Sequence, residues 1–175
     1  MADAPPGWLR HLFAVLILPF NAAVTIPALL AFTVRDLHWG WGQAGVFYYL
    51  PFALAAPAAL GGLLLMAVTI RQFARVGRGT LAPWDPTRAL VVTEPYARVR
   101  NPMLAGVNLI LAAESIALGS PALAAWTALF VVLNTLYFVF SEEPGLEKRF
   151  GAEYVVYRQN VPRWIPRLRP WRPDA

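Results

Sequence analysis

Two polar clusters lie at the edges of apolar segments in a chain that is 58% hydrophobic and only 14% charged. The first, residues 93–106, includes Arg98, Arg100 and Asn101, and the second is Ser141-Glu142-Glu143-Pro144. Adjacent carboxylates at the end of an apolar span are costly unless positive or hydrogen-bonding groups meet them. The arginines could pair with them in a purely structural cluster, or both could surround a charged ligand. Our hypothesis is that the two clusters meet and hold a cofactor.

The composition restricts the class of protein and the kind of site. Charged residues make up about a quarter of an average soluble domain, so this chain is predicted to be a single integral membrane domain over residues 1–175. The sequence contains no cysteine, and His11 and His38 lie far from both clusters, which disfavours a metal site. It also lacks the glycine-rich motifs of dinucleotide and phosphate sites and the Gly-x-Ser-x-Gly motif of hydrolases.

Long apolar stretches predict an all-α membrane protein with about four transmembrane helices and a C-terminal amphipathic helix. The predicted spans are residues 8–34, 46–73, 102–119 and 122–140. The first span is too long for the apolar part of a signal peptide, so we expect it to be retained as a helix. Residues 89–93 could form a brief strand in the polar segment between the second and third spans.

The third and fourth spans are predicted to form a helical hairpin. They are joined by Ser120-Pro121, and this proline suits the first turn of the next helix. Both polar clusters then lie at the same membrane face. Residues 71–100 contain six arginines and the segment after Ser141 contains seven basic residues, whereas residues 35–45 contain one. This distribution predicts that both termini and the site lie on the cytoplasmic side of the inner membrane, with the basic residues near lipid headgroups rather than on nucleic acid.

Several residues have a structural explanation beside a functional one. Asn101 fits the N-cap of the third helix and Pro102 its first position. Gly106 would let either a ligand or a neighbouring helix approach, and Gly61-Gly62 favours a close helix contact. Polar residues inside the apolar spans could contact a substrate or partner, or hold helices together: Asn21, Asn108, Glu114 and Asn134.

The segment after the fourth span has a helical pattern of apolar and aromatic residues. Leu146, Phe150, Tyr154 and Tyr157 follow at spacings of four, four and three. The pattern predicts an amphipathic helix that lies on the membrane or folds over the site, interrupted by Gly151. Either arrangement would bring aromatic and basic side chains over the open end of the hairpin.

The order of these motifs resembles a known family of membrane enzymes. The motifs are Pro95-Tyr96, Arg100-Asn101-Pro102-Met103 with Gly106, Glu142-Glu143, and Phe150-Gly151 with Tyr154, Tyr157 and Val161-Pro162-Arg163. Over residues 77–166 the chain resembles the integral-membrane methyltransferases that include isoprenylcysteine carboxyl methyltransferases and phospholipid N-methyltransferases. The resemblance implies a core of residues 77–166 that binds S-adenosylmethionine, a transmembrane scaffold of residues 8–76, and an acceptor that enters from the bilayer.

The same resemblance implies roles for individual residues. Glu143 and Arg163 are the candidates for catalysis, with Glu143 as the base where the acceptor is an amine. Leu104 stands where the family usually has tyrosine, so a hydroxyl contact is absent or comes from elsewhere, such as Tyr96. No metal is needed, because methyl transfer mainly requires alignment of donor and acceptor. The implied cofactor-binding residues are Tyr96, Arg100, Asn101, Pro102, Met103, Gly106, Glu142, Glu143, Tyr154 and Tyr157.

Three functions remain open from the sequence. The first is an S-adenosylmethionine-dependent methyltransferase acting on a lipid-like or small hydrophobic acceptor, either an isoprenylcysteine-type carboxylate or a phospholipid amine. Oxygen, nitrogen and sulfur all remain open as the methylated atom, and so does the oligomeric state. The second is a membrane reductase of the sterol-reductase type that uses NADPH. The third is a non-enzymatic membrane scaffold in which the arginines and glutamates form only a structural ion-pair cluster.

Overall fold

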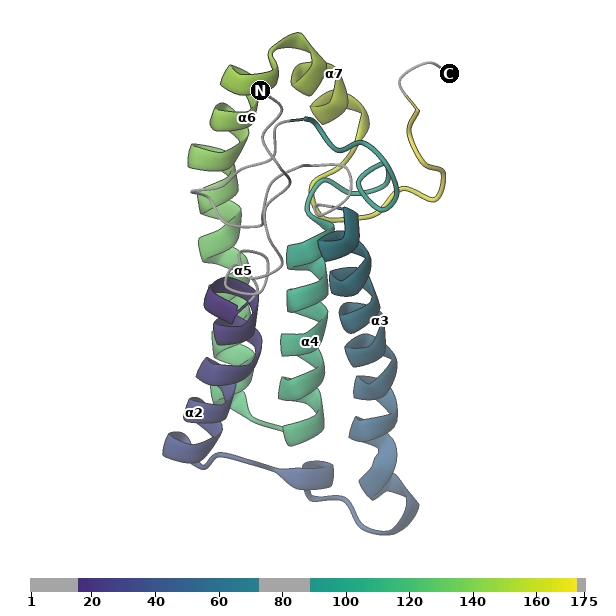
Figure 1. The fold of residues 1–175 in the computed structure, drawn as a ribbon. Helices are drawn as coiled ribbons and strands as arrows, with labels where there is room; N and C mark the ends of the chain where they lie inside the picture. Colours follow the sequence, from purple (N-terminus) through teal and green to yellow (C-terminus); the bar gives the residue numbers. More distant parts are fainter. Residues whose placement is uncertain (1–15, 73–88, 173–175) are drawn as a thin grey trace.

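The computed structural model describes residues 16–72 and 89–172, and within them every regular element is helical. Long helices stand side by side, α6 continues the line of α5 beyond the others, and the short helix α7 follows at the same end (Figure 1). This arrangement confirms the predicted all-α fold. The elements are η1 (Leu16–Thr25), α2 (Ile26–Val34), η2 (Trp39–Gly42), η3 (Gly45–Tyr49), α3 (Leu50–Gln72), α4 (Pro102–Leu118), α5 (Pro121–Tyr137), η5 (Phe138–Glu142), α6 (Glu143–Phe150) and α7 (Ala152–Asn160).

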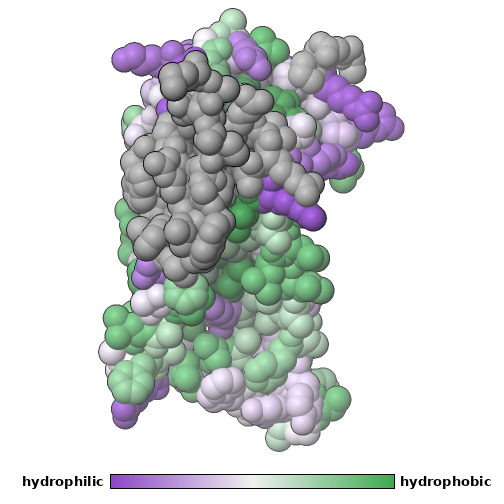
Figure 2. Space-filling view, viewed as in Figure 1, coloured by the Kyte–Doolittle hydropathy of each residue, from purple (hydrophilic) through white to green (hydrophobic). Residues whose placement is uncertain are grey.

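Two helical stretches are long and apolar enough to cross a membrane, Gly45–Gln72 and Pro121–Phe150. Only 17% and 6% of their most apolar windows are buried inside the protein, so these side chains face outward, as they do in contact with lipid. Figure 2 shows this hydrophobic surface below a more hydrophilic end. Pro19–Val34 and Pro102–Leu118 are shorter apolar helices. Length thus supports two of the four predicted spans, and residues 8–15 of the first predicted span lie outside the described residues.

Helices α3 and α4 approach closely where each has a glycine. A Cβ added at Gly62 would lie 2.6 Å from the carbonyl oxygen of Gly106, and one added at Gly106 would lie 2.9 Å from the carbonyl oxygen of Gly62. Nothing lies within 4 Å of a Cβ added at Gly61. Of the two predicted reasons for Gly106, a ligand or a helix, the structure shows the helix.

A small apolar core joins the first helical segment to the α4–α5 hairpin. Trp126 of α5 donates its indole N–H to the carbonyl oxygen of Ala22 at 3.1 Å. In the π register of η1, that carbonyl would pair with residue 27, but Pro27 has no amide hydrogen. The tryptophan therefore satisfies a carbonyl that the proline leaves free. The buried residues of this core are Ala22, Ala23, Val107 and Leu111, with Met66, Ile110, Trp126 and Phe130 packed against them.

The loop after α2 is fastened to the turn between α4 and α5. Asp36 accepts hydrogen bonds from the Ser120 hydroxyl at 2.6 Å and from the Ala122 amide at 2.7 Å. These hydrogen bonds lower the pKa of Asp36. Ser120 is also the N-cap of α5 and accepts a hydrogen bond from the Leu123 amide at 3.1 Å. The predicted turn at Ser120-Pro121 is confirmed, with Pro121 in the first position of α5.

The helix that begins with α5 extends beyond residue 140, where the predicted fourth span ends. It continues through the π-helical segment η5 into α6 and ends at Phe150. Glu142 and Glu143 therefore lie inside a continuous helical stretch and not at a helix C-terminus. Pro144 has no amide hydrogen and cannot donate a helical hydrogen bond. The π-helical segment directly before it allows the helix to continue despite this loss.

The segment after residue 146 forms two helices instead of a single amphipathic one. Helix α6 ends at Phe150, and Gly151 adopts φ 57° and ψ −133° before α7 begins. This backbone conformation is essentially restricted to glycine, so Gly151 sets the corner between the two helices.

The aromatic side of these two helices folds onto the loop that precedes α4. Residues 89–93 of that loop form no strand, because the described residues contain no second strand with which they could pair. Of the two predicted positions for the amphipathic segment, the structure thus favours folding over the hairpin end. The buried residues here are Tyr154, Tyr157 and Val161, packed against Leu90, Val92, Leu146, Phe150 and Trp171.

Candidate cofactor site at the open end of the helical hairpin

Glu143 is buried and accepts hydrogen bonds from two arginines on one carboxylate oxygen. Its Oε1 lies 2.8 Å from Nη1 of Arg100 and 2.7 Å from Nε of Arg163. The side chains of Glu143 and Arg100 are only 8% and 11% exposed, so solvent screens their interaction little. The hydrogen bond to Glu143 raises the pKa of Arg163. The expected meeting of the two polar clusters is thus confirmed for Arg100 and Glu143.

Three separate segments bring these residues together. Arg100 lies just before the start of α4, Glu143 begins α6, and Arg163 follows α7. The Arg100 amide donates to the carbonyl oxygen of Pro162 at 2.9 Å, which places Arg163 beside Arg100. One carboxylate faces two guanidinium groups, so this Arg100–Glu143–Arg163 cluster has a net positive charge.

Three buried polar atoms on this side of the hairpin have no hydrogen-bond partner among the described residues. They are Nε of Arg100, Nδ2 of Asn101 and Oδ1 of Asn108. Asn101 is the N-cap residue of α4, as predicted, but its side chain caps no amide. Asn108 follows it by seven residues, about two helical turns, so both asparagines lie on one face of α4. Buried polar groups without partners are uncommon, and a polar ligand at this face would satisfy them.

The sequence named Asn108 only as one of several polar residues inside the spans. The signal that separates it from the others is its spacing from Asn101, which becomes informative once the start of α4 is known. Leu104 lies between them on the same face, three residues after Asn101 and four before Asn108.

Glu142 lies beside the Arg100–Glu143–Arg163 cluster. Its Oε2 accepts a hydrogen bond from the Tyr137 hydroxyl at 3.3 Å, and the residue is half-buried. Burial raises the pKa of the Tyr96 phenol well above its usual range, and the neighbouring Tyr157 and Glu142 raise it further. Tyr96 therefore remains protonated at neutral pH and lies close enough to Glu142 to be affected by its charge.

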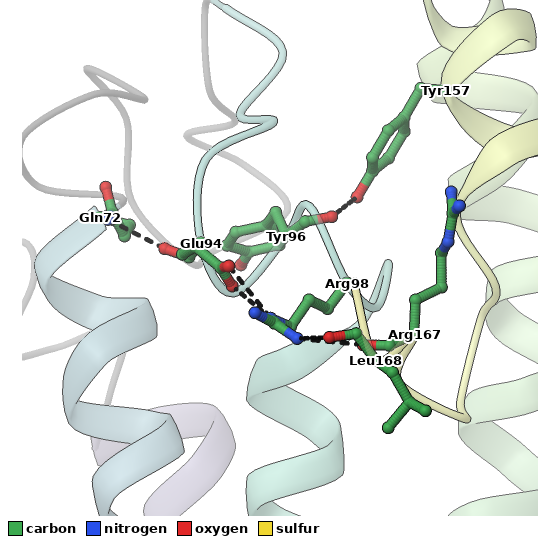
Figure 3. A network of polar contacts seen from close by, with 7 residues as sticks. All are labelled: Gln72, Glu94, Tyr96, Arg98, Tyr157, Arg167 and Leu168. Carbon is green, nitrogen blue, oxygen red and sulfur yellow. Dashed lines mark hydrogen bonds and ion pairs between the residues drawn. The ribbon is translucent and has the colours of Figure 1, made fainter. Parts of the chain in front are cut away.

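The two tyrosines of α7 hold this helix against the hairpin end. Tyr157 donates its hydroxyl to the carbonyl oxygen of Tyr96 at 2.9 Å (Figure 3). Tyr154 is buried beside the ion pair of Arg100 and Glu143. Burial and the charge of Glu143 raise the pKa of Tyr154, while a hydrogen bond with Arg100 lowers it.

The remaining expected site residues lie at or near the start of α4. Pro102 begins the helix and is buried, and Met103 is half-buried. Gly106 contacts α3, as described above. Arg98 does not pair with the Glu142-Glu143 cluster as expected, because its Nε forms an ion pair with Glu94 at 3.0 Å. This partner lies four residues away in the chain, closer than either glutamate of the second cluster.

Comparison with known proteins identifies the family. The family model described as phospholipid methyltransferase matches residues 50–153, which is more than half of the chain. The chain belongs to the phospholipid methyltransferase family. The match begins with α3 and includes Arg100, Asn101, Glu142 and Glu143. It confirms the resemblance to the integral-membrane methyltransferases.

The chain is also similar to part of a curated protein whose name states a reaction. Methanethiol S-methyltransferase 2 of Bradyrhizobium diazoefficiens is 38% identical over 76 residues, which cover 42% of this chain and 27% of that protein. The match thus spans little more than a quarter of the length of this relative. No solved structure matches the chain.

Proposed function

We propose that this protein is an S-adenosylmethionine-dependent membrane methyltransferase whose cofactor binds at the open end of the α4–α5 hairpin. The Arg100–Glu143–Arg163 cluster, with the unpartnered Nε of Arg100 and Nδ2 of the adjacent Asn101, is the observation that carries this proposal. The proposed cofactor-binding core lies within residues 77–166, of which residues 77–88 are outside the described part. The arginine distribution supports a cytoplasmic position for this end of the protein.

The donor set fits the polar groups of S-adenosylmethionine. Its methionyl carboxylate would find N–H donors in Nε of Arg100 and Nδ2 of Asn101, which lack partners among the described residues. Its ribose hydroxyls or amino group would find an acceptor in Glu142, which receives one hydrogen bond from Tyr137 and has further acceptor capacity. When bound, the cofactor supplies an electrophilic methyl group.

Glu143 is better suited to positioning than to proton transfer. Taking up a proton would disrupt the charge-assisted hydrogen bonds that Arg100 and Arg163 make to its Oε1. We therefore assign Glu143 the role of fixing the two arginines, and we keep Arg163 as a candidate for contact with the reacting groups. An acceptor that arrives as an anion suits this arrangement, because it needs no base.

A thiol or another small hydrophobic nucleophile is the acceptor that we favour over a phospholipid amine. Both acceptors must lose a proton, but a thiol then becomes an anion, which the net positive charge of the Arg100–Glu143–Arg163 cluster favours, whereas an ammonium group has the same sign of charge as the cluster. The name of the Bradyrhizobium relative points to a thiol, and the family description points to a phospholipid. Entry from the bilayer suits both classes of acceptor.

Cofactor binding tests the proposal. Titration calorimetry of the full chain in detergent should show saturable binding of S-adenosylmethionine. Glu142→Gln should weaken that binding roughly 10-fold or more, as expected for loss of a hydrogen bond to a charged group. Glu153→Gln, which changes an exposed carboxylate on α7, is the control and should leave the affinity unchanged. A folded protein that binds no S-adenosylmethionine would rule the proposal out, and binding of reduced nicotinamide instead would favour the reductase alternative.

The acceptor is tested separately with radiolabelled S-adenosylmethionine. The label should pass to methanethiol or a similar small thiol, and more slowly or not at all to a phospholipid amine in the total lipid extract. Faster labelling of the lipid amine would reverse the preference between the two acceptors and leave the cofactor assignment intact.

A further inference from the structure

The segment after α7, residues 162–172, runs along the loop that leads into α4. We refer to it as the C-terminal strap. Because residues 97–100 directly precede the first turn of α4, the strap lies at the membrane edge of the helices. Three backbone hydrogen bonds of 2.8 to 3.0 Å join it to that loop: Arg100 N to Pro162 O, Arg167 N to Arg98 O, and Trp171 N to Ala97 O.

Arg98 fastens the strap to the ends of both α3 and α4. Its Nη1 donates to the backbone carbonyl oxygens of Arg167 and Leu168, and its Nε pairs with Glu94 at 3.0 Å. Gln72, the last residue of α3, donates its side-chain amide to the carbonyl oxygen of Glu94 at 3.0 Å. Figure 3 shows this chain of contacts from Gln72 to the strap. The strap is therefore held in place relative to the membrane-spanning part of the molecule.

The strap presents apolar side chains that the described residues leave uncovered. Leu168 is 94% exposed and Ile165 is 80% exposed, the highest values among the large hydrophobic residues that are described. In Figure 3 the side chain of Leu168 points in the direction in which α4 runs from the loop, and Arg167 points the opposite way. The Arg167 guanidinium donates to the carbonyl oxygen of Asn160 at 2.6 Å. Leu168 is thus directed toward the side on which the bilayer lies.

The charges of the strap are all positive. It contains four arginines and no acidic residue. Arg163 contacts Glu143 and Arg167 contacts the Asn160 carbonyl, whereas Arg169 and Arg172 are exposed and pair with no described residue. Exposed apolar side chains, one of them directed at the bilayer, next to arginines that pair with no described residue, are the combination that interfacial segments use to bind acidic lipids.

We propose that the C-terminal strap is a membrane-interface anchor. Ile165 and Leu168 insert at the boundary between headgroups and acyl chains, and Arg169 and Arg172 bind the headgroups of acidic phospholipids. Because Arg163 belongs to the same strap, contact with the bilayer also helps to hold one side of the candidate cofactor site. The anchor is independent of the proposed reaction, since it depends only on the placement and chemistry of the strap.

The absence of cysteine allows the anchor to be tested at a single position. A spin label on Leu168→Cys would be measured in the full chain, reconstituted in nanodiscs of phosphatidylcholine with or without phosphatidylglycerol. For each label, the measured quantity is the ratio of its collision rate with oxygen to its collision rate with a water-soluble nickel complex. This ratio should be several-fold higher for the label at position 168 than for a control label on Gln159→Cys, an exposed position of α7. Adding phosphatidylglycerol should increase this difference.

A second comparison tests whether Arg169 and Arg172 cause the effect of phosphatidylglycerol. Arg169→Gln/Arg172→Gln, introduced with the label at position 168, should abolish the increase caused by phosphatidylglycerol. The proposal is overturned if the label at position 168 is as accessible to nickel as the label at position 159. It is equally overturned if phosphatidylglycerol changes nothing in the chain that retains both arginines. Thermal unfolding of each labelled protein shows that the comparison is made between folded chains.

Discussion

At the scale of single residues, the two adjacent glutamates of the chain have different environments. Glu143 is buried between Arg100 and Arg163, whereas Glu142 is half-buried and receives a hydrogen bond from Tyr137. A buried carboxylate that holds two guanidinium groups has a structural task, and its neighbour has acceptor capacity left for a ligand. The pair therefore separates into a positioning residue and a proposed cofactor contact.

This difference predicts unequal effects on stability. Glu143→Gln should lower the free energy of unfolding by about 3 kcal/mol, because it leaves a buried arginine without its counter-charge. Glu147→Gln is the matched control, since it removes the ion pair with Arg158 between side chains that are 43% and 37% exposed. Its effect should stay below about 1 kcal/mol. Unfolding in mixed detergent micelles measures both, and similar losses in the two variants would contradict the role given to Glu143.

The sequence could indicate which residues belong to the candidate site but not how they are arranged. Arginines before the first helix of a predicted hairpin and glutamates after its second were sufficient to expect that Arg100 and Glu143 meet at its open end. The division of labour between Glu142 and Glu143 could not be predicted, because it depends on Arg163, which arrives from a segment with no helical pattern. The expected pairing of Arg98 was wrong because a closer partner, Glu94, lies one turn away.

At the scale of elements, the apolar runs and the Ser120-Pro121 turn were enough to predict the hairpin. Its second apolar span was predicted to end at residue 140, and the helix continues beyond that span to Phe150. Local patterns could not show this, because a π segment accommodates Pro144 and distant arginines neutralise part of the acidic charge. The predicted strand at residues 89–93 failed for a similar reason, since strand formation requires a partner that no local pattern supplies.

The contact between α3 and α4 gives a prediction with a built-in control. Gly62→Ala places a Cβ 2.6 Å from the carbonyl oxygen of Gly106 and 2.8 Å from Cγ1 of Ile110, so the two helices must move apart. The expected cost is about 1–3 kcal/mol. Gly61→Ala meets no atom within 4 Å and should be neutral or slightly stabilising. Thermal unfolding in detergent compares the two variants, and an equal response would argue against the close approach.

At the scale of the whole molecule, carboxylates fasten both ends of the α4–α5 hairpin. Glu143 binds the arginines at the open end, and Asp36 binds Ser120 and the Ala122 amide at the turn. Between these ends the contacts are mainly apolar, around Val107 and Leu111. The hairpin is thus held by polar contacts at its two ends and by apolar packing between them.

The contribution of Asp36 to stability, at the turn between α4 and α5, should depend on pH. Hydrogen bonds lower the pKa of Asp36, so its contribution to stability is present above the unfolded-state pKa of about 3.9 and is lost as the pH falls through the lower folded-state value. Asp36→Asn should therefore be less stable than the natural protein at neutral pH. The difference should shrink below about pH 4. Thermal unfolding over this range is the measurement, and a difference that does not vary with pH would contradict the prediction.

The order of the cluster residues along the chain bears on how the protein is synthesised. Arg100 leaves the ribosome before Glu143, and Arg163 follows only after the whole hairpin and α7. During insertion the carboxylate of Glu143 therefore has one of its two partners, and the second arrives with residues 162–172. The membrane helices can assemble first, as successive segments do during translation, while the site remains open. A nascent chain interrupted after α7 would hold its hairpin in the bilayer with the candidate site still lacking Arg163.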